Sequence, residues 1–236
     1  MLATPSSVDL IKHELQPLGD IERLVDSERL VTHQSSRMYG DSLDPPSRVA
    51  LLRHTTDVAL ANGFTGITVV ADVTVTGSNP TEVLDLLSYE LLVDRWLATG
   101  APAVILCAID AETVGRSTID IIESAHHLSR GRANQLTFRF HGTRQGVAFE
   151  GELDAFNGDQ FTVGLFAAAS AAGSPLVIDI SEVSFAGVDT VCRLAAFAGS
   201  MADEGRELIV RGAQPIVHRV WQLISPTLHV AIDFDP

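Results

Sequence analysis

Acidic side chains stand in the N-terminal half where a parallel sheet could place a ligand site. Asp72 comes late in the apolar segment "GITVVADVTV", and Asp110 ends the segment "PAVILCAID". Ligand sites of α/β proteins collect at the carboxyl ends of parallel strands, although such residues also simply cap the turns and helices that follow. Capping is the simpler interpretation, and both residues are kept as candidate ligand-binding residues.

Three further side chains in this half could bind or react. Glu90 lies beside the apolar stripe of a predicted helix, where a carboxylate needs either a partner or a proton, and a structural pair is the simpler interpretation. His126 also lies on an apolar stripe, as a satisfied core histidine does more often than a ligand or a base. Cys107 lies in an apolar strand, the usual place of a buried thiol.

The common catalytic motifs are missing from the sequence. A phosphate-binding loop needs a glycine-rich turn with a lysine, and the only lysine, Lys12, lies in "DLIKHEL" with no glycine beside it. No GxGxxG, GxSxG or CxxC motif occurs. The adjacent His126 and His127 lack the i, i+4 spacing of two metal ligands on one helix face, which disfavours a metal site with Cys107. We therefore expect a protein that is not an enzyme and has no cofactor or metal.

The composition of the chain limits the kinds of partner that we expect it to bind. The chain has 236 residues, with 30 acidic and 16 basic side chains and a net charge of −14, so nucleic acid is not an expected partner. No apolar run reaches the roughly 18 residues of a membrane span, and the N-terminus lacks the features of a signal peptide. We expect a soluble, cytoplasmic protein without a membrane partner.

Predicted helices and strands alternate in the N-terminal half. One helix begins with Asn79 as its cap and ends at Gly100, an earlier one has Ser47 as its cap and Gly63 as its stop, and another begins at Ser117. Between them lie the strands of "GITVVADVTV" and "PAVILCAID". This order predicts an α/β layer with a mainly parallel sheet.

The pattern changes after residues 129–135, which we take as a linker between domains at 1–130 and 136–236. "LTFRFHG" and "GVAFEGELDAF" alternate as antiparallel strands should, with "GTRQG" as the turn between them. The remainder predicts helices at 160–172, 188–200 and 215–223, strands at 176–180 and 207–211, and an edge strand in "HVAIDF". A mixed sheet covered by helices is the expected fold.

The segments "GELD", "PLVIDISEVSFAGVDTVCRLAAFA" and "IVRGAQPIVHRV" resemble a STAS domain, the fold of bacterial anti-sigma factor antagonists. The resemblance covers about residues 136–234. It implies a partner-binding surface at the turn after "VIDIS" and on the helix that follows. The residues so implied are Ser184, Phe185, Gly187, Val188, Asp189 and Thr190.

In that family the turn carries an Asp followed by a Ser or Thr that a partner kinase phosphorylates. The ungapped match puts Gly187 and Val188 at these two positions, and we favour it because Phe185 fits it. A match moved by two residues puts Asp189 and Thr190 there, so Thr190 is a candidate phosphoacceptor. In the favoured match Asp189 is a helix-start residue, or a fixed negative charge that weakly imitates a phosphate.

The N-terminal half resembles the later part of a MEDS domain, a sensory module related to RecA- and KaiC-type ATPases. The resemblance rests on the segments around "GFTGITVVADVTVTG", "LLSYELL", "VILCAID" and "SAHH". It implies a small-ligand site with a candidate residue in or beside each segment. These are Asp72 (commonly Glu in the family), Glu90, Cys107, Asp110 and His126. The family's opening strands have no counterpart here, so we expect either that they are missing or that an upstream start codon has been overlooked.

These resemblances imply a signalling regulator in which a MEDS-like input domain, a RecA/KaiC-like remnant, is joined to a STAS domain that binds an anti-sigma factor or a related kinase. Two alternatives stay open. The first is a small-molecule receptor or degenerate enzyme with its site in the N-terminal sheet. The second is a structural scaffold or homodimer within a signalling assembly.

Overall fold

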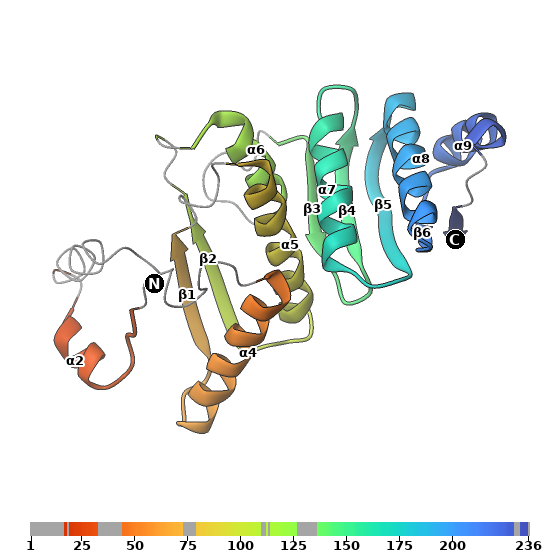
Figure 1. The fold of residues 1–236 in the computed structure, drawn as a ribbon. Coiled ribbons are helices and arrows are strands. Elements are labelled where there is room, and N and C mark those ends of the chain that lie inside the picture. Colours follow the sequence, from red (N-terminus) through yellow and green to blue (C-terminus); the bar gives the residue numbers. More distant parts are fainter. Residues whose placement is uncertain are drawn as a thin grey trace. The chain divides into compact units, whose positions relative to one another are not determined.

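The computed structural model describes residues 17, 19–32, 44–72, 79–109, 112, 114–126, 136–228 and 232–235, which form two compact units (Figure 1). The first unit comprises Met1–Ser78 and Pro102–Val114, and the second comprises Asn79–Ala101 and Gly115–Pro236. The expected linker at 129–135 lies outside the described residues, and the domain limits 1–130 and 136–236 remain predictions. No helix in the described part combines the length and apolar character needed to cross a bilayer.

The first unit holds helices α2 (Ile21–Asp26) and α4 (Pro45–Ala61) and strands β1 (Ile67–Asp72) and β2 (Ala103–Ala108). The two strands pair in parallel, from Ile67 opposite Ala103 to Asp72 opposite Ala108. The predicted parallel pairing is therefore confirmed.

Helix α4 begins earlier than predicted. Its N-cap is Asp44 and its first residue is Pro45, so Ser47 as the cap was wrong. Proline has no N–H to leave unpaired and its φ already suits a first helical turn, so the two prolines start the helix instead of preceding it. The predicted stop is confirmed, because Gly63 has a φ of +85°, which glycine adopts without strain.

The second unit is a five-stranded mixed sheet with a helical layer. Its strands are β3 (Phe138–Gly142), β4 (Val147–Leu153), β5 (Leu176–Ala186), β6 (Leu208–Arg211) and β7 (Asp233–Asp235), side by side in that order. The β3–β4 pair is antiparallel, as the sequence predicted, and the other pairs are parallel, so the sheet is mixed as expected. Strand β5 is longer than the predicted 176–180, because it continues along β4 through two shifts of register.

The helices of this unit are α5 (Pro80–Leu97), α6 (Arg116–Ser124), α7 (Gly158–Ala171), α8 (Val188–Asp203) and α9 (Pro215–Leu228). Helices α7 and α8 cross the same face of the sheet (Figure 1). Helix α5 begins as predicted, with the Asn79 side chain accepting a hydrogen bond from the N–H of Thr81 at 2.8 Å. Helices α5 and α6 both pack on β3, and α5 also packs along α7.

Phenylalanine rings fill the space between the helical layer and the sheet. Phe138, Phe140 and Phe149 stack with ring centroids 5.7 to 5.9 Å apart, and Phe161 of α7 meets the Phe149 ring edge-on at 5.3 Å. Phe140 and Phe149 are fully buried. Because a Cβ atom on Gly142 would lie 2.1 Å from the carbonyl oxygen of Leu91, α5 lies close against the end of β3.

Candidate functional site

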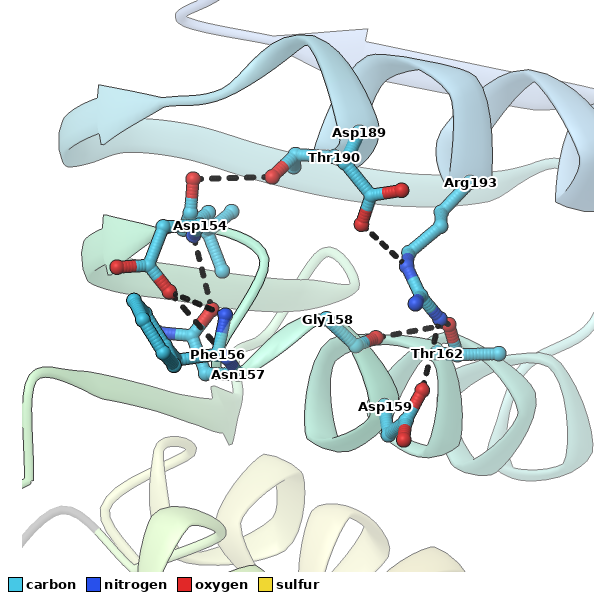
Figure 2. A network of polar contacts seen from close by, with 10 residues as sticks. Asp154, Phe156, Asn157, Gly158, Asp159, Thr162, Asp189, Thr190 and Arg193 are labelled. Atoms are coloured by element: carbon cyan, nitrogen blue, oxygen red, sulfur yellow. Dashed lines mark hydrogen bonds and ion pairs between the residues drawn. The ribbon is translucent and has the colours of Figure 1, made fainter.

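The turn between β5 and α8 is tied to the end of β4. Gly187, the N-cap of α8, donates its N–H to the carbonyl oxygen of Leu153 at 2.8 Å. The hydroxyl of Thr190 donates to the same oxygen at 2.9 Å (Figure 2). Two donors on one buried carbonyl fix where α8 begins.

The predicted partner-binding residues at this turn differ in exposure, and Thr190 is buried whereas the others described here are exposed. The Thr190 side chain is buried, 4% exposed, and its hydroxyl is engaged with Leu153, so a kinase could reach it only if the junction opened. Phe185 and Val188 are 52% and 60% exposed. Ser184 is exposed, and its hydroxyl donates to the carbonyl oxygen of Gly151 at 3.2 Å. Phosphorylation of Thr190 remains a prediction.

Arg193 connects the first turns of α8 and α7. Its Nε donates to Asp189 at 2.7 Å, and its NH1 donates to Asp159 at 3.0 Å and to the hydroxyl of Thr162 at 3.1 Å (Figure 2). The hydrogen bond to Asp189 is the main reason why the pKa of Arg193 rises above its ordinary value. Arg193 was not among the residues predicted from the sequence, although its i, i+4 spacing from Asp189 is a signal for an ion pair.

The loop after β4 lies against this turn, because a Cβ atom on Gly187 would be 3.8 Å from the Cα of Asp154. The Asp154 carboxylate accepts from the N–H groups of Phe156 at 2.8 Å and Asn157 at 3.3 Å. The Asn157 amide donates in turn to the carbonyl oxygen of Glu152 at 2.6 Å. These contacts fix the backbone at Phe156, a residue that is 95% exposed and was not predicted from the sequence as a site residue. We call Phe156, Phe185 and Val188 together the turn surface.

A second cluster of polar side chains is centred on Glu90, a buried residue of α5. Glu90 is 4% exposed, and its Oε2 lies 3.6 Å from Nε2 of His126, at the end of α6. His126 Nδ1 lies 2.7 Å from the carbonyl oxygen of Ile122. A structural pair was the simpler interpretation of Glu90, and His126 is the neighbour that the structure places beside it.

Asp94 lies one helical turn after Glu90 and accepts a hydrogen bond from the N–H of Gly142 at 3.1 Å. Burial raises the pKa of Asp94 from 3.8 to about 7, and the negative charge of Glu90 adds to the rise. The hydrogen bond from Gly142 and the charge of His126 act in the opposite direction.

The other candidate ligand-binding residues belong to the first unit or lie outside the described residues. Cys107 is half-buried in β2 and belongs to the first unit, whereas Glu90 and His126 belong to the second. Asp72 is the last residue of β1. Asp110 and His127 lie outside the described residues.

The first unit contains a pocket of about 570 Å³ between α4, β1 and residues 25–32. Its lining is mainly apolar, with a few polar side chains among the apolar ones. The apolar members include Val25, Leu30, Val58, Phe64, Ile67 and Val69, and the polar ones include Arg29, Thr55 and Asn62. Volume and lining are both in the range of small-molecule sites.

Comparison with known proteins assigns the first half of the chain to a family. A family model described as MEDS, the MEthanogen/methylotroph, DcmR Sensory domain, matches residues 1–127 of the 236, more than half of the chain. No curated protein matches the sequence. A sensory domain indicates a role in signalling. The chain belongs to the MEDS family of sensory domains.

Proposed function

We propose that the part of the chain after the MEDS match is a STAS-type module that binds a protein partner through the turn surface, and that the MEDS part supplies its input. The observation that carries the proposal is the exposure of Phe156, Phe185 and Val188 on backbone that hydrogen bonds hold in place. Exposed apolar side chains on a fixed frame favour binding because little conformational entropy is lost on association.

The order of strands and helices supports the STAS part of the proposal. An antiparallel β3–β4 pair is followed by strands that join the sheet in sequence, each after one helix. The turn surface lies at and just after the carboxyl ends of β4 and β5. The resemblance puts the partner-binding turn after the "VIDIS" strand segment. Gly187 and Val188 occupy the family's Asp and phosphoacceptor positions in the favoured match, so we propose a partner surface without a phosphorylation switch there.

The charges near the turn surface limit the kind of partner protein that could bind there. Carboxylates are frequent on the segments that carry this surface, and the one arginine of the network already faces two of them. They are Glu152, Asp154, Asp159, Glu182 and Asp189, all exposed or half-buried. A complementary partner therefore has an apolar centre with basic side chains around it, and added salt weakens the contact. An anti-sigma factor or its kinase domain is the partner class that the resemblance implies.

Affinity capture with the full chain from extract of the native cell tests this function. The comparison uses wild type, Phe156→Ser on the turn surface, and Leu223→Ser as the control, since Leu223 is also exposed, at 74%, but lies two turns into α9. We expect a protein captured by wild type and the control and lost with Phe156→Ser. Equal capture by all three would reject the turn surface as the binding site.

A second function is favoured by the pocket in the first unit. A sensory family and a mainly apolar pocket of about 570 Å³ together support a receptor for a small, largely apolar molecule. Thermal unfolding across a panel of small organic molecules tests it, because a ligand that binds only the folded chain raises the melting temperature. A shift lost in Val58→Arg, which fills the pocket, and kept in Glu90→Gln would place the ligand in this pocket.

A further inference from the structure

We propose that Glu90 and His126 bind a divalent transition-metal ion of the Zn²⁺ type. Their Oε2 and Nε2 atoms lie 3.6 Å apart, beyond the range of a direct hydrogen bond. Glu90 lies on α5 and His126 lies two residues after α6, and both helices pack on β3.

The tautomer of the His126 ring follows from the atom that faces its Nδ1. Nδ1 lies 2.7 Å from the carbonyl oxygen of Ile122, and a carbonyl can only accept, so Nδ1 carries a hydrogen. In the neutral ring, Nε2 then presents a lone pair. This atom is shielded from solvent and has no hydrogen-bond partner in the described structure.

A buried lone pair that faces a carboxylate oxygen is unfavourable unless a proton or a metal ion lies between the two atoms. A proton, on either Nε2 or the carboxyl group, gives a simple hydrogen-bonded or ionic pair, whereas a metal ion binds both atoms. Histidines that bind metals commonly donate their other ring N–H to a backbone carbonyl, as His126 does to Ile122. The arrangement therefore has the tautomer of a metal ligand already in place.

The spacing also suits the ion. Zn²⁺ binds imidazole nitrogen and carboxylate oxygen at about 2.0 to 2.2 Å, so atoms 3.6 Å apart would subtend about 120°, near the tetrahedral angle. The backbone of His126 is held as well, because its carbonyl oxygen accepts from Arg139 at 3.4 Å. Two protein ligands leave further positions for water or a small ligand.

Equilibrium dialysis of the chelator-treated full chain, made without a histidine tag, against Zn²⁺ alone tests the proposal. We expect about one ion per chain, and a loss of affinity of at least about tenfold in both His126→Ala and Glu90→Gln. His218→Ala is the control, since that ring contacts Phe234 instead. Circular dichroism checks that each variant is folded. If His126→Ala does not fold, Glu90→Gln still tests the proposal, because it keeps the size of the side chain.

A second readout separates the metal from the ion pair. Co²⁺ in place of Zn²⁺ gives visible absorption whose intensity reports four-coordinate geometry, and the band should disappear in Glu90→Gln. No bound Zn²⁺ in wild type, or equal binding by wild type and both variants, would overturn the proposal and leave Glu90 and His126 as an ion pair only. Neither outcome bears on the turn surface.

Discussion

Arg193 donates from Nε to the carboxylate of Asp189 at 2.7 Å, one turn earlier on α8. The fixed negative charge that the sequence suggested at Asp189 is thus balanced by a neighbouring cation that also connects to α7. Asp189→Lys would disturb this connection as well as the surface. Phe156 and Val188, whose side chains are exposed, are cleaner positions for testing partner binding.

Gly158→Ala tests the Arg193 connection. A Cβ atom at this position would lie 2.6 Å from Nε of Arg193 and 3.0 Å from the Asp189 carboxylate, so the guanidinium must move away. We expect thermal unfolding a few degrees lower in Gly158→Ala than in wild type. In an Arg193→Ala background the same change should be neutral or stabilising, since alanine favours helix over glycine. Equal effects in both backgrounds would show that Arg193 does not constrain position 158.

Thr190→Val tests the tie between α8 and β4. Valine keeps the shape of threonine but cannot donate to Leu153, whose carbonyl oxygen keeps only the N–H of Gly187. We expect a loss of about 1 kcal/mol in the free energy of unfolding, measured with denaturant. A variant as stable as wild type would mean that this hydrogen bond contributes nothing to stability.

Intact-mass analysis of protein from native cells tests the prediction that Thr190 is a phosphoacceptor. A phosphate on Thr190 would show that the junction between α8 and β4 opens.

Much of the fold follows from local sequence signals. Asn79 and Pro80 start α5 because a side-chain acceptor and a missing N–H both suit a helix start, and alternation in "LTFRFHG" predicts β3. Ser47 failed as a cap because it competed with a better start at Asp44 and Pro45. The parallel pairing of β1 with β2 followed from the alternation of helices and strands along the N-terminal half.

The sites were predicted less completely, because they depend on contacts between distant residues. Arg193 meets Asp159 across 34 positions of the chain, and Glu90 meets His126 across 36, with no local pattern to pair them. Phe156 was missed since an apolar residue after a strand suggests burial, whereas the Asp154 turn holds it outward. The turn residues Phe185 and Val188 were found only through the family resemblance.

Asp94 should make the stability of the chain depend on pH. Its pKa is about 7 in the folded state against 3.8 ordinarily, so between these values the folded chain binds more protons than the unfolded chain. Stability therefore falls as pH rises from about 4 to 7, by an amount of the order of a few kcal/mol at most. The groups around it are Glu90, His126 and the N–H of Gly142.

Asp94→Asn should flatten this dependence, because the amide still accepts from Gly142 but does not titrate. Denaturant unfolding of chelator-treated protein at a series of pH values measures it. Asp94→Ala, which removes the acceptor too, should be less stable than Asp94→Asn at every pH. The same slope in wild type and Asp94→Asn would contradict the raised pKa.

The most direct test of the account is the affinity of the full chain for the protein that it captures, measured by calorimetry for wild type, the double variant Phe156→Ser with Val188→Ser, and Leu223→Ser. Because the altered side chains are exposed, all three proteins should unfold at similar temperatures. We predict that the double variant raises the dissociation constant by at least about tenfold while Leu223→Ser leaves it unchanged. A double variant that binds as tightly as wild type would contradict the central claim that the turn surface is where the partner binds.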